Sequence, residues 1–225
     1  MSTPVDVRAD SRIAAATDAL HSSRHGSDRA VPLLRVDLQQ IADWVQPDSR
    51  VLDLGCGDGT LLAHLRAQKR CHGYGVEISD DHVAECVRVG INVIQANLDA
   101  GLRMFTAAMF DTVVLSQTLQ AMHNAEGILR EMARVARQGI VSFPNFGHWK
   151  HTISLLSGRM PVTRHIPYQW YDTPNIHLCT LRDFEDLASK VGLNITGRAL
   201  FADGRSVHLL PSWRATLAVY RFETR

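Results

Sequence analysis

A short acidic and glycine-rich segment holds the residue types in this sequence best suited to binding a small polar ligand. The segment is VLDLGCGDG, residues 51–59, in which an apolar run is followed by glycines at every second position. The run is typical of a buried strand, and residues 60–65 have helical spacing. A glycine loop between a strand and a helix lets a ligand approach the backbone, because no Cβ stands in the way. The residues predicted to bind the ligand here are Asp53, Gly55, Cys56, Gly57 and Gly59.

The spacing of the glycines separates three known kinds of loop. A dinucleotide-binding loop starting at Gly55 would place its third glycine at position 60, which is Thr60. A phosphate-binding loop would need Gly-Lys-Ser/Thr after the last glycine, and that is also missing. The loop instead resembles the first motif of class I S-adenosylmethionine-dependent methyltransferases, which implies S-adenosylmethionine or S-adenosylhomocysteine as the cofactor. For the loop alone, a tight strand-to-helix turn is the alternative.

A carboxylate at the end of the next predicted strand strengthens the cofactor interpretation. The segment 73–78 has the pattern of a strand, and Glu77 follows Gly57 by 20 residues. An acidic residue at about this distance accepts hydrogen bonds from ribose hydroxyls in related α/β sites. We therefore predict that Glu77 and its neighbour Ile78 bind the ligand. The alternative is a solvated glutamate at a strand end.

Two later loops follow predicted strands and face the same edge of the sheet. Asn97 and Leu98 follow the strand predicted at 93–96 and are candidates for adenine contacts. An asparagine oxygen can accept from the adenine amine, although without the help of a charge, and we favour this role; a simple Asx turn is the alternative. Ser116 follows the strand predicted at 110–115 and should face the methionine end of the cofactor.

The order of these elements predicts the fold. Strands and helices alternate along most of the chain, which favours a Rossmann-like α/β fold with a parallel sheet covered on both faces. In the helix after the second strand, Ser79 should be the cap and Val83 and Val87 should point inward. Two β-type segments at 193–201 and 214–222 should form an antiparallel pair at the sheet edge. The complete prediction is a mostly parallel, seven-stranded sheet.

An aromatic-rich insert, residues 144–179, interrupts the alternation after the fifth strand. Trp149, Ile153 and Leu156 should form one face of a helix. Because the insert leaves the carboxyl end of a parallel strand, it must lie over the ligand crevice, as a lid, a partner surface or both. His148 and His177 are candidate bases or ligands, although histidines in such segments more often bond to the backbone. No catalytic residue is assigned and no metal site is expected.

The composition limits the other classes of function. The chain has 225 residues with 45% hydrophobic content, which suits a single domain at 31–225 after a flexible extension at 1–30. Lys plus Arg total 24 against 23 Asp plus Glu, so charge does not indicate nucleic acid or a membrane surface as a partner. The four cysteines form no CxxC pair, and we expect a cytoplasmic protein.

Longer strings resemble one family, the methionine biosynthesis protein MetW. The resemblance runs from about Leu33 to Phe222, and it departs from expectation at Asn97, where an acidic residue is more usual. It implies a methyltransferase fold that acts as a companion of homoserine O-acyltransferase; a homodimer is a further expectation. The strings are VLDLGCGDGTLL, FDTVVLSQTLQ, SFPNFGHW, GRMPVT, PYQWYDTPNIHLCT and RDFEDL.

Three hypotheses about function follow from the sequence. In the first, a companion subunit binds S-adenosylmethionine, which is made downstream of the acyltransferase step, and reports its level to the acyltransferase. In the second, the chain is a true methyltransferase that acts on a small molecule or a protein. The sequence after the fourth strand, Ser116-Gln117-Thr118-Leu119, lacks the motif that amine methylases use. In the third, the domain is structural and its pocket is empty.

Overall fold

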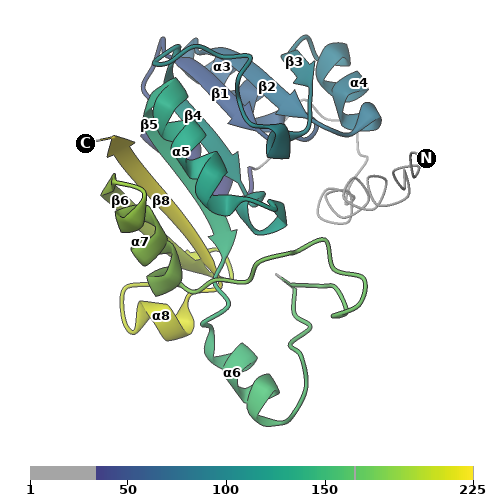
Figure 1. Ribbon diagram of the computed structural model, residues 1–225, viewed down its shortest axis with the longest axis vertical. Helices are drawn as coiled ribbons and strands as arrows, with labels where there is room; N and C mark the ends of the chain where they lie inside the picture. Colours follow the sequence, from purple (N-terminus) through teal and green to yellow (C-terminus); the bar gives the residue numbers. More distant parts are fainter. Residues whose placement is uncertain (1–33, 165, 225) are drawn as a thin grey trace, which may run out of the picture.

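An eight-stranded sheet organises the part of the chain that the computed structural model describes, residues 34–164 and 166–224 (Figure 1). The predicted extension at 1–30 lies outside these residues. Five strands are parallel, in the order β3-β2-β1-β4-β5. Because the order reverses beside β1, the carboxyl ends of β1 and β4 form the crevice in which open α/β sheets bind ligands. The strands are β1 (Arg50–Leu54), β2 (His72–Glu77), β3 (Asn92–Gln95), β4 (Phe110–Ser116) and β5 (Ala136–Pro144).

The other end of the sheet is antiparallel, as the sequence predicts. Strand β8 (Leu217–Thr224) pairs with β5 on one side and with β6 (Leu193–Ala202) on the other. The eighth strand, which was not predicted, is the two-residue β7 (Arg205–Ser206) at the edge. The prediction that the last strand starts at residue 214 was wrong, because Pro211 begins a short helix, α8 (Pro211–Arg214), before it.

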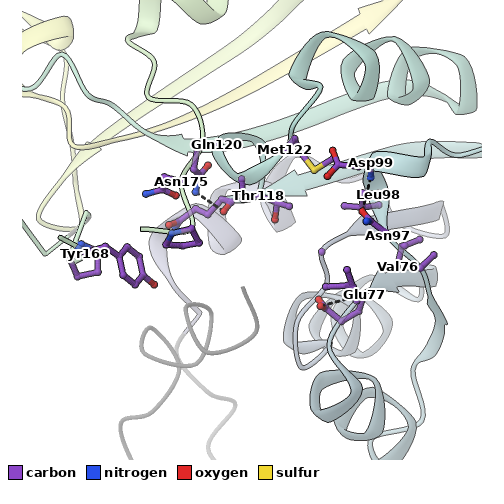
Figure 2. Close-up of a pocket in the computed structure, with 17 residues that line it drawn as sticks. Val76, Glu77, Asn97, Leu98, Asp99, Thr118, Gln120, Met122, Tyr168 and Asn175 are labelled. Carbon is purple, nitrogen blue, oxygen red and sulfur yellow. Dashed lines mark hydrogen bonds between the residues drawn. The ribbon is translucent and has the colours of Figure 1, made fainter. Parts of the chain in front are cut away.

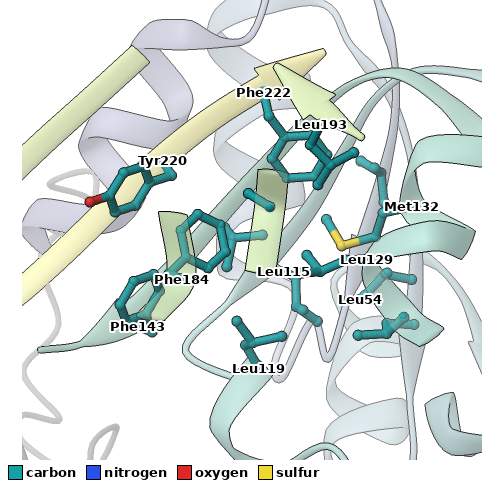
Figure 3. Close-up of a cluster of buried hydrophobic side chains, with 14 of the residues drawn as sticks. Leu54, Leu115, Leu119, Leu129, Met132, Phe143, Phe184, Leu193, Tyr220 and Phe222 are labelled. Carbon is teal, nitrogen blue, oxygen red and sulfur yellow. The ribbon is translucent and has the colours of Figure 1, made fainter. Parts of the chain in front are cut away.

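Two hydrophobic clusters lie on opposite faces of the sheet. Successive residues of β1 alternate between them, with Leu52 and Leu54 in one cluster and Val51 in the other. Figure 3 shows part of the first cluster, where the rings of Phe143 and Tyr220 stack with centroids 5.8 Å apart. The central strands β1, β4 and β5 are therefore buried on both faces, as expected for a covered parallel sheet, whereas β3 at the edge is mostly exposed. The first cluster includes residues of α5 (Ala125–Val135) and α7 (Leu181–Lys190), and the second includes residues of α2 (Val36–Trp44), α3 (Thr60–Lys69) and α4 (Asp80–Arg88).

The inward face of α4 differs from the prediction. Ser79 caps this helix as expected, but His82 and Cys86 are the buried residues, while Val87 is 64% exposed. The reason lies in the glycine loop and β2, which present polar partners: His82 Nδ1 is 4.0 Å from Glu77 Oε1, and Cys86 Sγ is 3.9 Å from Cys56 Sγ. The buried face of α4 is therefore formed by His82, beside Glu77, and by Cys86, in the second hydrophobic cluster.

The insert contains one helix, α6 (Trp149–Leu156), followed by an extended chain (Figure 1). Its two ends are adjacent, since Phe146 N donates to Cys179 O at 3.0 Å. The start is fixed by Asn145, whose side chain is buried and donates to Ser212 O and Ala215 O. The insert is thus a long loop that leaves the core and returns to the same place.

Candidate functional site

A cavity lies at the carboxyl edge of the sheet and is closed on one side by the insert (Figure 2). Two short 3-10 turns contribute to it, η1 (Leu98–Ala100) after β3 and η2 (Leu119–Ala121) after β4. The cavity therefore lies where the order of the strands predicts a ligand. The sheet side includes Gly55, Glu77, Ile78, Asn97, Leu98 and Asp99, and the insert side is formed by Pro167, Tyr168, Pro174 and Asn175.

Glu77 is a buried carboxylate in this cavity with only 7% of its surface exposed. Its two oxygens accept from the backbone N–H groups of Gly57 at 2.9 Å, Ile78 at 2.8 Å and Ser79 at 3.0 Å. Burial alone would raise the pKa of Glu77, but the contact with His82 and these three donors hold it below its ordinary value. Ile78 and Ser79 donate to Oε1, which also faces His82, whereas Oε2 accepts only from Gly57 among these donors. Because each carboxylate oxygen has about two acceptor positions, Oε2 can still accept from one ligand hydroxyl.

The glycine loop shapes the floor beside Glu77. Gly55 lines the cavity with φ +69°, and a Cβ on it would lie 2.7 Å from Thr118 Oγ1. Gly57 has φ +55°, and a Cβ there would meet no atom within 4 Å. The space beside Gly57 is therefore open, although Gly57 is not one of the residues that line the cavity. Gly59 caps α3 with φ +79° and allows Cys86 to approach, so its position in the fold concerns packing.

Asp53 lies in β1 directly before the loop and is 2% exposed. Its Oδ1 has no hydrogen-bond partner among the described residues. Burial, together with the negative charge of Glu77, raises the pKa of Asp53 to about 7. A buried carboxylate without a partner is unfavourable, and a cationic ligand group beside it would supply the missing interaction. Asp53 does not itself line the cavity.

Both candidates for adenine contacts, Asn97 and Leu98, lie in the cavity, and Asn97 also forms the Asx turn that was the alternative. Asn97 Oδ1 accepts from Asp99 N at 2.9 Å, which is an Asx turn that caps η1. Asn97 and Leu98 both line the cavity. The Asp99 carboxylate accepts from His123 N at 3.0 Å and lies 2.7 Å from His123 Nδ1. These bonds fix the η1 turn against the loop after β4.

Ser116 and Cys56 point away from the cavity. Ser116 Oγ donates to Asp37 Oδ2 at 3.2 Å, on the first turn of α2. Burial would raise the pKa of Asp37, but the charge of Arg35 and hydrogen bonds from Gln117 and other donors lower it. Asp37 could not be identified from the sequence, since an acidic residue in a first helical turn is ordinary. Cys56 is buried against Cys86 under the loop.

Several cavity residues were not predicted from the sequence. After β4, Gln117, Thr118 and Gln120 line the cavity, and the insert adds Tyr168 and Asn175. The available signal was the rule that ligands bind after the carboxyl ends of parallel strands, which singles out a loop but no residue in it.

The candidate histidines lie elsewhere. His148 caps α6, where its Nδ1 accepts from Lys150 N at 3.4 Å, and His177 Nε2 is 3.5 Å from His123 O. Neither lines the cavity. Within the described ranges no three metal-ligating side chains converge, and no helix there is long and apolar enough to cross a bilayer.

Solved structures with the same fold define the class. A chain from the complex between the Haloferax volcanii Trm112 methyltransferase activator and the putative methyltransferase is similar with a TM-score of 0.67, at 14% identity, over 98% of this chain and 99% of that chain. An S-adenosylmethionine-dependent methyltransferase from Thermotoga maritima, a possible histamine N-methyltransferase, has a TM-score of 0.61 at 15% identity, over 85% and 89% of the two chains. The chain thus has the S-adenosylmethionine-dependent methyltransferase fold.

The sequence comparison identifies the family within that class. Residues 35–222 match the model of the methionine biosynthesis protein MetW family, and the chain belongs to this family. The resemblance found in the sequence is therefore confirmed. The bifunctional methionine biosynthesis protein MetXA/MetW of Rhodopirellula baltica is 37% identical over 174 residues, which cover 72% of this chain. The match spans only 28% of the length of that relative.

Proposed function

We propose that this chain is a cytoplasmic companion subunit that binds S-adenosylmethionine or S-adenosylhomocysteine in the cavity and associates with homoserine O-acyltransferase. The observation that carries the ligand proposal is Glu77, which three backbone N–H groups keep ionised at the edge of the cavity. The methyltransferase fold of the similar structures supports it.

The residues present suit both ends of such a ligand. In this proposal Glu77 accepts from a ribose hydroxyl, and Asn97 and Leu98, which also line the cavity, contact the adenine ring. The unpartnered Oδ1 of Asp53 suits the ammonium group of the amino-acid end, and Gly57 leaves open space near it. S-Adenosylmethionine would supply an electrophilic methyl group when bound, but binding needs only these contacts.

The polar groups after β4 favour binding over catalysis. Gln117 Nε2 donates to Asp37 at 2.9 Å, and Gln120 Nε2 donates to Gln117 O at 2.6 Å. The NH2 groups of these two side chains are therefore engaged within the protein. Burial and the charge of Asp172 raise the pKa of Tyr168, so the phenol keeps its proton at neutral pH and is a poor base. The cavity lining that the structure describes includes no His, Lys or Cys.

The insert offers an apolar surface to a partner. On α6, Trp149 is 41%, Ile153 55% and Leu156 83% exposed. In the extended part of the insert, Trp170 is 71% and Tyr171 69% exposed. Exposed apolar groups rich in aromatic residues mark protein interfaces. The relative from R. baltica carries MetXA and MetW in one polypeptide, which supports an acyltransferase as the partner. We call these five side chains the insert surface.

Calorimetric titration with S-adenosylmethionine and S-adenosylhomocysteine tests the ligand proposal. Glu77→Ala should abolish binding, because it removes the ribose acceptor. Wild-type protein that binds neither compound, or a Glu77→Ala variant that binds them normally, would contradict the proposal.

Association with purified homoserine O-acyltransferase tests the partner proposal. Leu156→Glu should weaken association at least tenfold, whereas Val87→Glu on the exposed side of α4 should not change it. Repeating the measurement with saturating ligand tests whether the subunit reports cofactor level, since regulation requires different partner affinities in the two states. If the affinity for the acyltransferase is the same with and without the ligand, the association stands but the proposed regulation is contradicted.

An active methyltransferase is the second candidate, and the complete set of Asp53, Gly55, Gly57 and Glu77 favours it. Incubation with labelled S-adenosylmethionine and a cell extract should then label an acceptor. Binding without any labelled product favours the companion subunit.

A further inference from the structure

The two sides of the cavity come from distant parts of the chain, and a third segment, the η2 turn, lines the cavity as well. The sheet side contains Glu77 and Asn97, and the insert side contains Tyr168 and Asn175. Figure 2 shows Gln120, in the η2 turn, between these two groups. Gln120 was not among the residues predicted from the sequence.

The backbone of Gln120 holds the insert on the core. Its carbonyl oxygen accepts from Ile176 N at 2.8 Å and from His177 N at 3.0 Å. Both donors follow directly after Asn175, which lines the cavity. The direction of one carbonyl group thus positions the insert side of the cavity.

The side chain of Gln120 is only half satisfied. Its Nε2 donates to Gln117 O at 2.6 Å, whereas its Oε1 is buried and has no hydrogen-bond partner within the described part of the chain. Leaving a buried acceptor unpaired is unfavourable, and a ligand N–H or O–H group would remove that penalty. Glu77 already supplies an acceptor on the other side of the cavity. The cavity therefore suits a ligand with hydrogen-bond donors at two separate places, such as the hydroxyls and the amines of an adenosine compound.

We propose that Gln120 is a ligand contact that couples occupancy of the cavity to the position of the insert. This inference rests on the proposed function and deepens it. A donor from the ligand to Oε1, together with the existing bond to Gln117 O, fixes the side chain at both ends. The side chain in turn fixes the backbone of Gln120 and the carbonyl that receives Ile176 and His177. The ligand then favours the state in which the insert is anchored to Gln120, because it binds this state more tightly than the state in which the insert is released.

The substitution Gln120→Met tests the contact, because methionine keeps the length of the side chain and removes both polar atoms. Affinity for S-adenosylhomocysteine should fall about tenfold or more, the usual effect of leaving a ligand donor unpaired. Gln68→Met makes the same chemical change at an exposed position of α3 and should leave affinity unchanged.

Amide hydrogen exchange tests the coupling. Saturation with S-adenosylhomocysteine should slow exchange of the Ile176 and His177 amides about tenfold in the wild type and in Gln68→Met. In Gln120→Met, saturation with S-adenosylhomocysteine should leave the exchange rates of these two amides unchanged.

The outcomes separate this inference from the proposed function. Normal affinity and normal slowing in Gln120→Met would overturn the inference while leaving the ligand site intact, whereas a wild type that binds no ligand overturns the proposed function. If Gln120→Met does not fold, the wild-type exchange rates still decide, because unchanged rates at Ile176 and His177 on ligand binding exclude the coupling.

Discussion

At the scale of single residues, the buried carboxylates of Asp53 and Glu77 have pKa values shifted in opposite directions. Three backbone N–H groups donate to Glu77, and its pKa is lowered. Asp53 Oδ1 has no such donor among the described residues, and burial next to Glu77 raises the pKa of Asp53 to about 7. Folding therefore favours the protonated form of Asp53, so this residue reduces the free energy of unfolding as the pH rises from about 4 to 7.

The substitution Asp53→Asn should stabilise the protein at the expense of binding. At pH 8 the free energy of unfolding should rise by up to about 4 kcal/mol, and the gain should shrink as the pH falls from 7 toward 4. Denaturant unfolding at several pH values measures it, with Asp203→Asn in an exposed turn as the control. Wild-type affinity for S-adenosylmethionine should also fall below pH 7, where Asp53 takes up its proton. A gain in stability that does not depend on pH would contradict this account.

Gly57 and Gly204 form a matched pair for testing the open space in the loop. Both have positive φ, and a Cβ on either would meet no atom within 4 Å. Substitution of either glycine by alanine should cost about 1–2 kcal/mol in stability, because the left-handed conformation is strained. Only Gly57→Ala should weaken ligand binding, which calorimetry measures directly. Equal affinities for the two variants would show that the space beside Gly57 is not used.

At the scale of elements, the sequence predicted the strands and helices well where apolar periodicity determines burial. The five parallel strands, the antiparallel end and α6 are all present. The inward face of α4 could not be predicted, because its buried residues face a carboxylate and a thiol in other elements. The anchor of the insert also has no sequence signal, since it is a backbone carbonyl that any residue at position 120 would have.

Asn145 should be essential for holding the insert at its starting point. Its side chain donates to Ser212 O and Ala215 O and accepts from Gly147 N. Asn145→Ala leaves buried backbone groups unpaired and should reduce the free energy of unfolding by about 2–4 kcal/mol. Thermal or denaturant unfolding measures the loss, and Asn194→Ala on the exposed side of β6 should change stability by less than about 0.5 kcal/mol. A loss as small as that of the control would contradict the anchoring role.

At the scale of the whole molecule, the insert concentrates exposed apolar groups away from the sheet. In Figure 1 α6 lies at the bottom of the view, beyond the covered core. The sequence predicted the apolar face of this helix but not its exposure, because periodicity cannot distinguish a face that packs on its own core from one left for a partner.

The chain on its own should form weak, concentration-dependent dimers through the insert surface, because exposed apolar groups favour association. Sedimentation equilibrium should show this association in the wild type and in Val87→Glu, and it should be weaker in Leu156→Glu. A wild type that remains monomeric up to high concentration, or equal association of the two variants, would contradict self-association through this surface.

The single hydrogen bond between Phe146 and Cys179 has a consequence for how the molecule can be taken apart. Because the insert leaves and re-enters the core at one place, a short linker could replace residues 147–178 without changing the order of any strand. The sheet side of the cavity is thus separable in the chain from the insert, which supplies Tyr168 and Asn175 to the other side. Exchange of this one loop would therefore replace the insert side of the cavity and the insert surface together, while the sheet beneath them stays the same.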